Sequence, residues 1–474
     1  MEKTDFLNEA FHPKSIAVVG ASSKEQARGW IARLQSFDYH GHLYPINPRV
    51  AEINGLKTYP TLRHIPGPVD YVIFNIPAQL TPQIMEDCIA KRVKIAHIYT
   101  AGFSETGTDE GKRLEARVAA IAKGGGVRVF GPNCLGLYYP VGGLTFNSTF
   151  PKKSGMVSFV SQTGGGAIRF VQLANDRGIY FNKVISYGNA VDLDSPDFLN
   201  YLASDKETEI ICCYIEGVRD GRRFLEAVKR CLVTKPVIIM KAGLTESGAG
   251  AVASHTASLA GSALVWDAFF KQTGAIRADS LEKITDIILA LSLMKCPKGR
   301  QVGIIGRGGG LGVMATDACE RAGLKVPSFL PETRKQLEEI IPEAGANARN
   351  PVESAAGISG IADFLPKGMK IVDADTQIDF ILANISVDVY GGPGPGLKEQ
   401  LVKLADILGS TAQYLTKPVV AVLYSGEGLV AIASVLKARE TLLKAGIPVY
   451  PTIDAAAWAV CQLIKYHEFF HKLF

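Results

Sequence analysis

The sequence lacks the features that mark membrane-spanning, secreted and nucleic-acid-binding proteins. No apolar run reaches the ~18 residues that a membrane-spanning helix needs. The first residues, MEKTDFLNEAFHPK, have no apolar core of the signal-peptide kind. The net charge is only +5, and no lysine- or arginine-rich run gathers it into a patch. The composition therefore favours neither a membrane nor a nucleic-acid partner.

The cysteines also form no pattern that indicates a metal site or a set of disulfides. The eight cysteines are scattered along the chain and form no C-x-x-C pair. Neither a metal site nor a disulfide framework is predicted, and a reducing cytoplasm is the compartment that we expect.

What is present is a long series of short β-branched runs alternating with helical patterns. The 474 residues suffice for about three domains, and 47% of them are hydrophobic. Strands that alternate with helices predict an α/β fold with parallel, doubly wound sheets. The expected strands cover residues 15–19, 42–46, 70–76, 94–100 and 127–131, then 155–160, 182–188, 209–217 and 236–243, and finally 301–306, 378–386, 418–424 and 447–451.

Breaks rich in glycine, proline or lysine at 138–155 and 293–300 divide this series into three α/β units. We expect the units to cover residues 1–145, 146–296 and 297–474. The segment YGGPGPG (390–396) is expected to be an exposed loop at a strand end, either a ligand contact or a plain connector.

Each unit opens with a strand, a glycine-bearing turn and a helix. The three openings are IAVVGASSK, VSFVSQTGGGAIRF and VGIIGRGGGLGVMATDACE. Glycine lets a ligand approach the backbone, and the helix that follows directs unpaired N–H groups at it. All three turns are therefore candidate anion sites.

The first turn does not fit NAD. Gly20 is followed by Ala-Ser-Ser-Lys-Glu instead of the G-x-G-x-x-G pattern. The second strand ends in YPINPRV, where an NAD site needs an acidic residue for the ribose. Arg49 suits a phosphate instead, so this unit is predicted to bind a phosphorylated nucleotide such as NADP or coenzyme A.

Several motifs, in order along nearly the whole chain, resemble one family. They are VVGAS, YPINPR, YTAGFSETG, GPNCLG, SGMVSFVSQTGG, YGNAVDLD, YIEGVRDGRRF, KPVIIMKAGLTESGAGAVASHTASLAG, GRGGGLGVMATDACERAGL and NPVES. The chain resembles the nucleoside-diphosphate-forming acyl-CoA synthetases, relatives of succinyl-CoA synthetase, and among them the α subunits of ADP-forming acetyl-CoA synthetases.

The resemblance implies a Rossmann-like CoA-binding domain followed by two flavodoxin-like domains. It also implies a coenzyme A site at Gly20, Ala21, Ser22, Ser23, Asn47, Pro48, Arg49, Ile76, Pro77, Thr100, Ala101, Gly102 and Asn133.

The family gives His255, in ASHTASLAGS, the role of a phosphoryl carrier. Its small neighbours lead us to expect a loop that can move, and Glu216 in YIEGV matches the carboxylate that fixes the imidazole tautomer. The phosphate-binding positions implied are Ser161, Gln162, Thr163, Gly164 and Gly165 at one helix start, and Gly308, Gly309 and Gly310 at another.

The family also needs an ATP-grasp domain, and no segment here resembles one. The resemblance therefore implies a β subunit that binds ADP or ATP with Mg²⁺, in an assembly expected to be α2β2. The implied reaction is acyl-CoA + ADP + phosphate ⇌ acid + CoA + ATP, through an acyl phosphate and a phosphohistidine.

Three positions depart from the family pattern. Arg49 stands where lysine is usual. Arg307 replaces the usual asparagine, so that the motif reads RGGG instead of NGGG, and Glu353 replaces the usual aspartate, so that NPVD reads NPVE. Arg49 keeps its charge with another geometry, and Arg307 could bind phosphate or contact a partner.

Two other functions are compatible with parts of the chain. One is a non-catalytic CoA-binding scaffold, against which the retention of His255, Glu216 and both glycine-rich helix starts argues. The other is an NADP-dependent oxidoreductase, which explains nothing beyond the first unit.

Overall fold

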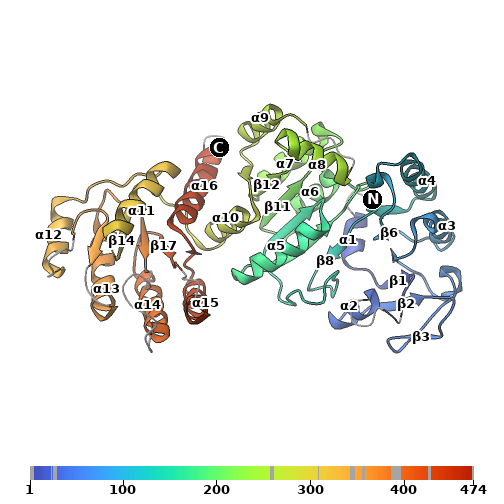
Figure 1. Cartoon of the computed structure of the whole chain (residues 1–474), viewed down its shortest axis with the longest axis horizontal. Coiled ribbons are helices and arrows are strands. Elements are labelled where there is room, and N and C mark those ends of the chain that lie inside the picture. Colours follow the sequence, from blue (N-terminus) through green and yellow to red (C-terminus); the bar gives the residue numbers. More distant parts are fainter. Residues whose placement is uncertain are drawn as a thin grey trace. The chain divides into compact units, whose positions relative to one another are not determined.

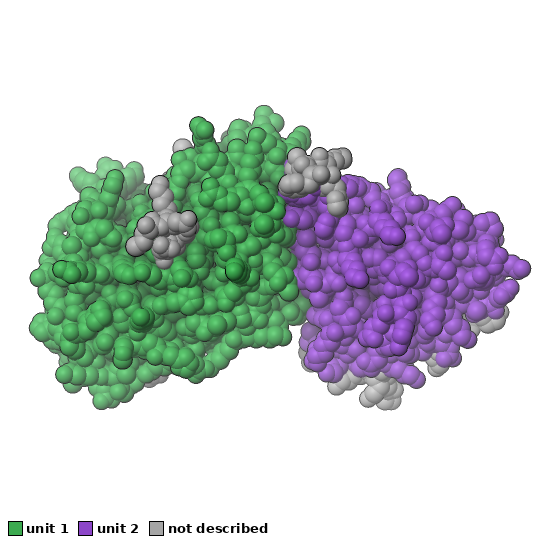
Figure 2. All heavy atoms as spheres, turned by 180° about the vertical axis from the view of Figure 1, so that it is seen from behind, with its two compact units in different colours: residues 1–284 green, residues 285–474 purple. Residues whose placement is uncertain are grey.

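The computed structural model describes residues 5–22, 24, 29–256, 261–307, 309–341, 347–354, 358–385, 397–424 and 429–471. Three large sheets flanked by helices follow one another along the chain (Figure 1). The chain forms two compact units, unit 1 (residues 1–284) and unit 2 (residues 285–474), distinguished by colour in Figure 2. Among the helices described, none is both long and apolar enough to cross a membrane.

The first sheet of unit 1 is parallel, with the strand order β2-β1-β5-β6-β7. Beyond β2, Tyr59 forms an isolated parallel bridge with Ile46 and takes the place of a further strand. With Tyr59 counted, the order is the Rossmann order 3-2-1-4-5-6. The elements are α1 (Asp5–Phe11), β1 (Ser15–Val19), α2 (Trp30–Ser36), β2 (His42–Ile46), the hairpin β3 (Glu52–Ile53) and β4 (Leu56–Lys57), η2 (Leu62–His64), β5 (Tyr71–Phe74), η3 (Ala78–Leu80), α3 (Thr81–Ala90), β6 (Ile95–Ile98), η4 (Ser104–Thr106), α4 (Asp109–Gly125) and β7 (Arg128–Phe130).

Local sequence explains the helix ends. In α4 the Thr108 hydroxyl accepts a hydrogen bond from the Gly111 N–H at 3.1 Å, and Asp109 and Glu110 occupy the first turn near the positive end of the helix dipole. Gly126 ends the helix in the left-handed conformation, with φ 71°.

The second sheet has the order β13-β12-β11-β9-β10-β8. Its five parallel strands follow the flavodoxin-like order 2-1-3-4-5, with the topological switch point between β9 and β11. The elements are β8 (Gly136–Tyr138), β9 (Val157–Ser161), α5 (Gly164–Asp176), β10 (Phe181–Ser186), α6 (Ser195–Ser204), β11 (Ile210–Ile215), α7 (Gly221–Leu232), β12 (Val237–Lys241), α8 (Glu246–Thr256), α9 (Ala263–Thr273), β13 (Ile276–Ala278) and α10 (Leu281–Leu293).

The sequence did not predict β8, which is an exception to the parallel pattern. It pairs antiparallel with β10 at the sheet edge, where Leu137 lies opposite Ile185. Although residues 136–138 precede the boundary expected at 145, their strand belongs to the second sheet. The boundaries at 145 and 296 themselves stay predictions.

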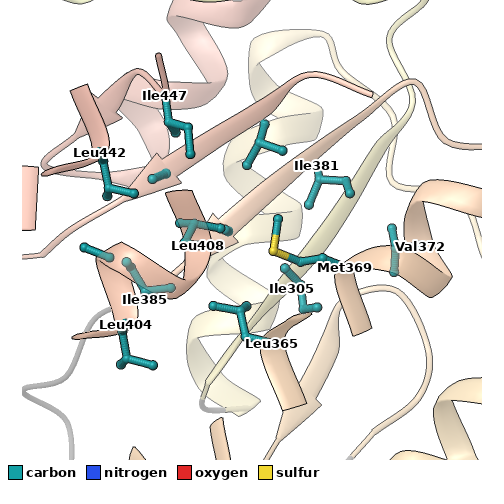
Figure 3. Packing of buried hydrophobic residues seen from close by; sticks show 14 of the residues in the cluster. Ile305, Leu365, Met369, Val372, Ile381, Ile385, Leu404, Leu408, Leu442 and Ile447 are labelled. Carbon is teal, nitrogen blue, oxygen red and sulfur yellow. The ribbon is translucent and has the colours of Figure 1, made fainter. Parts of the chain in front are cut away.

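Unit 2 contains a third parallel sheet with the same 2-1-3-4-5 order, β15-β14-β16-β17-β18. A large apolar cluster fills the space between the sheet and α13, α14 and α15, where Leu365, Met369 and Leu408 pack against Ile305 and Ile381 (Figure 3). The predicted loop 390–396 lies outside the described residues. The elements are β14 (Val302–Arg307), α11 (Gly309–Ala322), α12 (Pro331–Ile340), β15 (Val352–Ser354), α13 (Ile358–Ala374), β16 (Phe380–Asn384), α14 (Leu397–Ala412), β17 (Val419–Val422), α15 (Leu429–Lys444), β18 (Val449–Tyr450) and α16 (Ile453–His471).

Within unit 1, the first two sheets are joined by a backbone seam. The N–H groups of Asn189 and Val191 donate to the carbonyls of Pro132 and Gly131 at 3.0 and 2.9 Å. Gly188 has φ +56°, and a Cβ there would lie 2.3 Å from the carbonyl oxygens of both Pro132 and Asn133. The seam therefore requires glycine at this position, both for its conformation and for the close approach of the two backbones.

A buried lysine stabilises unit 1. Lys183 is fully buried on β10, and its Nζ donates to Asp205 Oδ2 and Glu207 Oε2 at 2.8 Å each. It also lies 4.7 Å from the ring centre of Tyr139, whose ring packs edge-on against Phe11 of α1. The ammonium thus links α1 and Tyr139, which follows β8, to the segment between α6 and β11.

The acidic partners of this lysine titrate below their usual range. Burial is the largest single influence on Asp205 and opposes its ionisation, but the hydrogen bonds from Lys183 and Thr208 and the charge of Lys183 together outweigh it, so the pKa of Asp205 is lowered. The hydrogen bond that Lys183 donates to Glu207 is the main cause of the lowered pKa of Glu207. Carboxyl groups whose pKa is lower in the folded state add stability above their unfolded pKa, and this stability is lost as pH falls through the folded pKa.

We predict that Lys183→Met lowers the Tm of unit 1 at pH 7 by roughly 5–10 °C, because Asp205 is left as a buried charge without its cation. Calorimetry at pH 7 and at pH 3.5 measures this, and the difference from wild type should shrink at the lower pH. Lys152→Met, which breaks the exposed pair with Asp38 (2.6 Å), is the matched control and should change Tm by about 2 °C or less. Equal Tm changes for the two variants would contradict the role given to Lys183.

Candidate active site

A cavity of about 500 Å³ lies in unit 1, between the carboxyl ends of β5 and β6 and the amino end of α5. Carboxyl ends of parallel strands and helix N-termini are where doubly wound folds bind ligands. Its lining residues are Asn75, Ile76, Pro77, Tyr99, Thr100, Ala101, Asn133, Cys134, Leu135, Gln162, Thr163, Gly164 and Gly165.

The strand-end wall of the cavity is held by one threonine. The Thr100 hydroxyl donates to the Ile76 carbonyl at 2.6 Å, and the Ile76 N–H donates back to that hydroxyl at 3.3 Å. The Thr100 carbonyl accepts from the Asn133 N–H at 3.0 Å. Burial raises the pKa of the neighbouring Cys134 thiol, so this cysteine is a wall residue and not a nucleophile.

The ends of β1 and β2 are linked to each other beside this wall. Gly20 has φ +85°, and a Cβ there would lie 2.0 Å from the Asn75 carbonyl oxygen, so only glycine fits. The Asn47 amide donates to the Ala21 carbonyl at 2.8 Å, and its Oδ1 accepts from the Arg49 N–H at 2.8 Å. The Arg49 side chain is exposed and forms no ion pair within the described part of the chain.

The opposite wall is the first turn of α5. The Thr163 hydroxyl accepts from the Gly166 N–H at 3.4 Å, and Ser161 braces the turn by donating to the Thr163 carbonyl at 2.8 Å. Gly164 and Gly165 follow, and as first-turn residues their N–H groups have no partner within the helix. A Cβ on Gly164 would lie 2.8 Å from Leu135 Cγ, which shows how closely the two walls approach.

Glu216 lies at the end of β11, next to the switch point of the second sheet. It is buried, with an exposed fraction of 2%. The Gln162 Oε1 accepts from the N–H groups of Glu216 and Gly217 at 2.5 and 3.0 Å, which ties the end of β11 to the start of α5. Burial raises the pKa of Tyr214 to about 12, and its hydrogen bond to the Glu216 carboxylate adds to the shift. Tyr214 therefore stays protonated and donates to a carboxylate.

A polar network that the sequence did not reveal joins the two domains beside the site. The Asn189 amide donates to Glu105 Oε2 at 2.6 Å and to Glu115 Oε2 at 2.8 Å. Glu105 also accepts from the Gly102 N–H at 2.6 Å. Burial opposes its ionisation, but these bonds lower the pKa of Glu105. The η4 turn that contains Glu105 packs against α8.

His255 belongs to α8, the helix that η4 contacts. The helix runs to Thr256, so the loop expected around His255 is wrong at this point. Its alanine-rich sequence favours a helix, and the Thr245 hydroxyl accepts from the Gly248 N–H at 3.1 Å at the helix start. The His255 side chain and residues 257–260 lie outside the described part of the structure.

In unit 2, the second glycine-rich segment follows β14. Gly309 opens α11, Gly310 is exposed and Gly308 lies outside the described residues. Glu353 Oε1 is buried and has no hydrogen-bond partner within the described part of the chain. Burial raises its pKa.

The cavity combines two sets of residues that the sequence motifs kept apart. Ile76, Pro77, Thr100, Ala101 and Asn133 come from the CoA-site prediction. The predicted phosphate residues that share the lining are Gln162, Thr163, Gly164 and Gly165. Asn75, Tyr99, Cys134 and Leu135 were missed, although the first three directly adjoin predicted residues. Predicted residues outside the lining are Gly20, Ala21, Ser22, Asn47, Pro48, Arg49, Gly102, Ser161, Glu216, Gly309 and Gly310. Ser23, Gly308 and the His255 side chain are not among the described parts of the chain.

Comparison with known proteins agrees with this arrangement. A CoA binding domain model matches residues 14–140, and a succinyl-CoA ligase like flavodoxin domain model matches residues 154–291. The chain is 36% identical over 466 residues to the acetate–CoA ligase (ADP-forming) II subunit alpha of Pyrococcus furiosus, covering 97% of this chain and 98% of that subunit. It is 35% identical over 457 residues to the acetate–CoA ligase (ADP-forming) of Methanocaldococcus jannaschii, but it covers only 62% of that longer protein.

The fold matches solved structures over the same length. The acetyl-coenzyme A synthetase 1 of Candidatus Korarchaeum cryptofilum, solved with phosphate and ADP and described as dinucleotide-forming, has a TM-score of 0.82 and 31% identity. The match covers 98% of this chain and 97% of that one. The fold class expected from the sequence is confirmed, and the chain belongs to the family of ADP-forming acid–CoA ligases, as a protein of the α-subunit type.

Proposed function

We propose that this chain is the catalytic α subunit of an ADP-forming acid–CoA ligase, which interconverts acyl-CoA, ADP and phosphate with acid, CoA and ATP. The single observation that supports this most is the shared cavity. Residues of the CoA-binding domain and the first turn of α5 line the same 500 Å³ space, so a thioester and a phosphate can meet there.

The first half-reaction would use the two walls of the cavity. The free N–H groups of Gly164 and Gly165 and the positive end of the α5 dipole would hold phosphate. A phosphate oxygen attacks the thioester carbonyl carbon, the C–S bond breaks, and acyl phosphate and CoA thiolate form. The thiolate then takes up a proton.

The residues beside the cavity suit coenzyme A. Exposed Arg49 would contact a phosphate of the cofactor by charge-assisted hydrogen bonds. The side-chain-free Gly20 would let a ligand approach the backbone at the end of β1.

The second half-reaction would occur at His255. A neutral imidazole nitrogen attacks the phosphorus, the bond from phosphorus to the acyl oxygen breaks, and the carboxylate leaves. Glu216, fixed by Gln162 and Tyr214, would accept a hydrogen bond from the other ring nitrogen and stabilise the tautomer that attacks.

Transfer from phosphohistidine to ADP needs a second subunit. This chain covers 98% of two Pyrococcus furiosus α subunits, but only 54% and 62% of the ADP-forming acetate–CoA ligases of Archaeoglobus fulgidus and Methanocaldococcus jannaschii. The extra length of those ligases supports a further subunit, and we propose that it is an ATP-grasp β subunit that holds ADP and Mg²⁺, in an α2β2 assembly in the cytoplasm. Acetate is the acid to test first, because these relatives are named for it. The acid to test second is 4-hydroxybutyrate, because another relative is named as its CoA ligase.

We predict that CoA raises the Tm of this chain and that NADP does not, because ligands stabilise the state that binds them. Arg49→Ala should weaken CoA binding roughly 3- to 30-fold, after solvent screening of an exposed contact. Calorimetric titration measures this, with Arg117→Ala on the exposed side of α4 as the control. If Arg49 binds the 3′-phosphate, the substitution Arg49→Ala should weaken the binding of dephospho-CoA, which lacks that phosphate, less than it weakens the binding of CoA. Equal losses would reject that contact.

A further prediction is that the isolated chain becomes phosphorylated on His255 by ³²P-acetyl phosphate. The label should be acid-labile and base-stable, whereas phosphate on Ser254, Thr256 or Ser258 would survive acid. His255→Ala should abolish the label without changing CoA affinity.

Glu216→Gln should slow labelling by roughly 100-fold or more, as other base-orienting carboxylates do. Glu226→Gln, on the exposed side of α7, is the matched control and should leave the rate unchanged. Label on His255→Ala equal to that on wild type would refute the phosphohistidine.

The proposed partner generates a separate prediction. The isolated chain should bind no ATP by calorimetry and form no ADP from ATP and acid, and an ATP-grasp subunit should add both activities. ATP turnover by the purified chain alone would contradict the division of labour between the subunits.

A further inference from the structure

Lys241 is a buried lysine beside the candidate site that the proposed reaction leaves without a role. It is the last residue of β12, after the apolar run Val-Ile-Ile-Met, and its exposed fraction is 6%. It lies opposite Ile215, the residue before Glu216, in the parallel pairing of β11 and β12. A buried ammonium is costly unless its surroundings compensate the charge.

The partners of Lys241 come from the segments that surround the phosphohistidine chemistry. Its Nζ donates to the Glu216 carbonyl at 2.8 Å and to the Ala242 carbonyl. It also lies 5.4 Å from the ring centre of Trp266 on α9. One ammonium therefore connects the strand end that bears Glu216, the segment that leads into α8 with His255, and the helix after it.

Glu216 is consequently held on both sides. The Gln162 side chain accepts from its N–H at 2.5 Å, and Lys241 donates to its carbonyl at 2.8 Å. With both peptide groups fixed, the direction in which the side chain leaves the backbone is restricted.

We propose that Lys241 is a positioning residue for phosphoryl transfer, which fixes the backbone at Glu216 through a charge-assisted hydrogen bond to its carbonyl. This inference rests on the function proposed above for Glu216 and His255. Lys241 would act through Glu216 and need not touch the phosphoryl group.

The protonation state of Lys241 makes this role dependent on pH. Burial lowers its pKa to about 8, and the charge of Glu216 opposes the shift. Of the other described groups at this point, Tyr214 has a pKa raised to about 12 by burial, and Trp266 does not titrate. Raising the pH through 8 removes the positive charge and weakens the hydrogen bond that holds the Glu216 carbonyl, so phosphoryl transfer should slow on the alkaline side.

The experiment measures the initial rate of His255 labelling by ³²P-acetyl phosphate on the full chain, from pH 6 to 9.5. Wild type should lose rate above about pH 8. Lys241→Met should be roughly 10- to 100-fold slower at pH 7, as when other residues that orient a functional side chain are removed. The labelling rate of this variant should not fall between pH 8 and pH 9.5. Lys241→Arg, which keeps its charge throughout this range, should restore most of the rate and also lack the fall.

The matched control is Lys235→Met, two residues before β12 begins. Lys235 is also buried, with 8% exposed, and donates to the Leu202 carbonyl at 2.6 Å and to the Asp205 carbonyl. Its removal should lower Tm without changing the labelling rate. The CoA affinity of each variant, compared with that of wild type, shows whether the variant is folded.

Equal rate losses in Lys235→Met and Lys241→Met, or a wild-type rate in a folded Lys241→Met, would overturn the inference while leaving the proposed function intact. If Lys241→Met does not bind CoA, a wild-type profile that stays flat to pH 9.5 overturns it equally. No label on wild type at any pH would remove the basis of both proposals.

Discussion

The close approach of two backbones at Gly188 is the contact on which the candidate site depends. A side chain there would collide with the carbonyls of Pro132 and Asn133, so the seam between the first two domains can form only around glycine. The seam holds the turn 131–136 against the second domain, with the Leu135 N–H donating to the Ser186 hydroxyl at 3.1 Å. Leu135 in turn contacts the start of α5. The cavity exists because this contact brings the CoA-binding domain to a helix N-terminus.

Buried charged and polar side chains stabilise the same arrangement at several points. Lys183 links α1 and Tyr139 to the segment between α6 and β11, and Asn189 connects two carboxylates of the first domain to the seam. Lys241 and Gln162 bracket Glu216 at the switch point. These hydrogen bonds to backbone and acidic partners offset part of the cost of taking polar groups out of water. Those of Lys241 and Gln162 connect the ends of β11 and β12 to the start of α5.

Much of this could be predicted from sequence because it depends on local patterns. The strand 15–19 is β1 in the structure, and the glycine-rich run after residue 161 does open α5. The family and the fold class followed from motifs of several residues and are confirmed. Short edge elements such as β8 and β13 were missed, since three residues give no periodic signal.

What the sequence could not supply were contacts between distant segments. The bonds of Asn189 to Glu105 and Glu115 span 84 and 74 residues, and the clamp of Lys241 on Glu216 spans 25. The loop expected at His255 failed for another reason. Small residues suggested mobility, but alanines at 249, 251 and 253 also favour a helix, and the helix continues through Thr256.

The central claim is that coenzyme A and phosphate are bound in one cavity of this chain. A crystal structure of the chain grown with CoA and phosphate together tests it most directly. The account predicts the CoA thiol beside Asn133 and Leu135, and a phosphate on the N–H groups of Gly164 and Gly165 in the same cavity. Phosphate found elsewhere while CoA occupies this cavity, or CoA that excludes any anion from the α5 N-terminus, would contradict it.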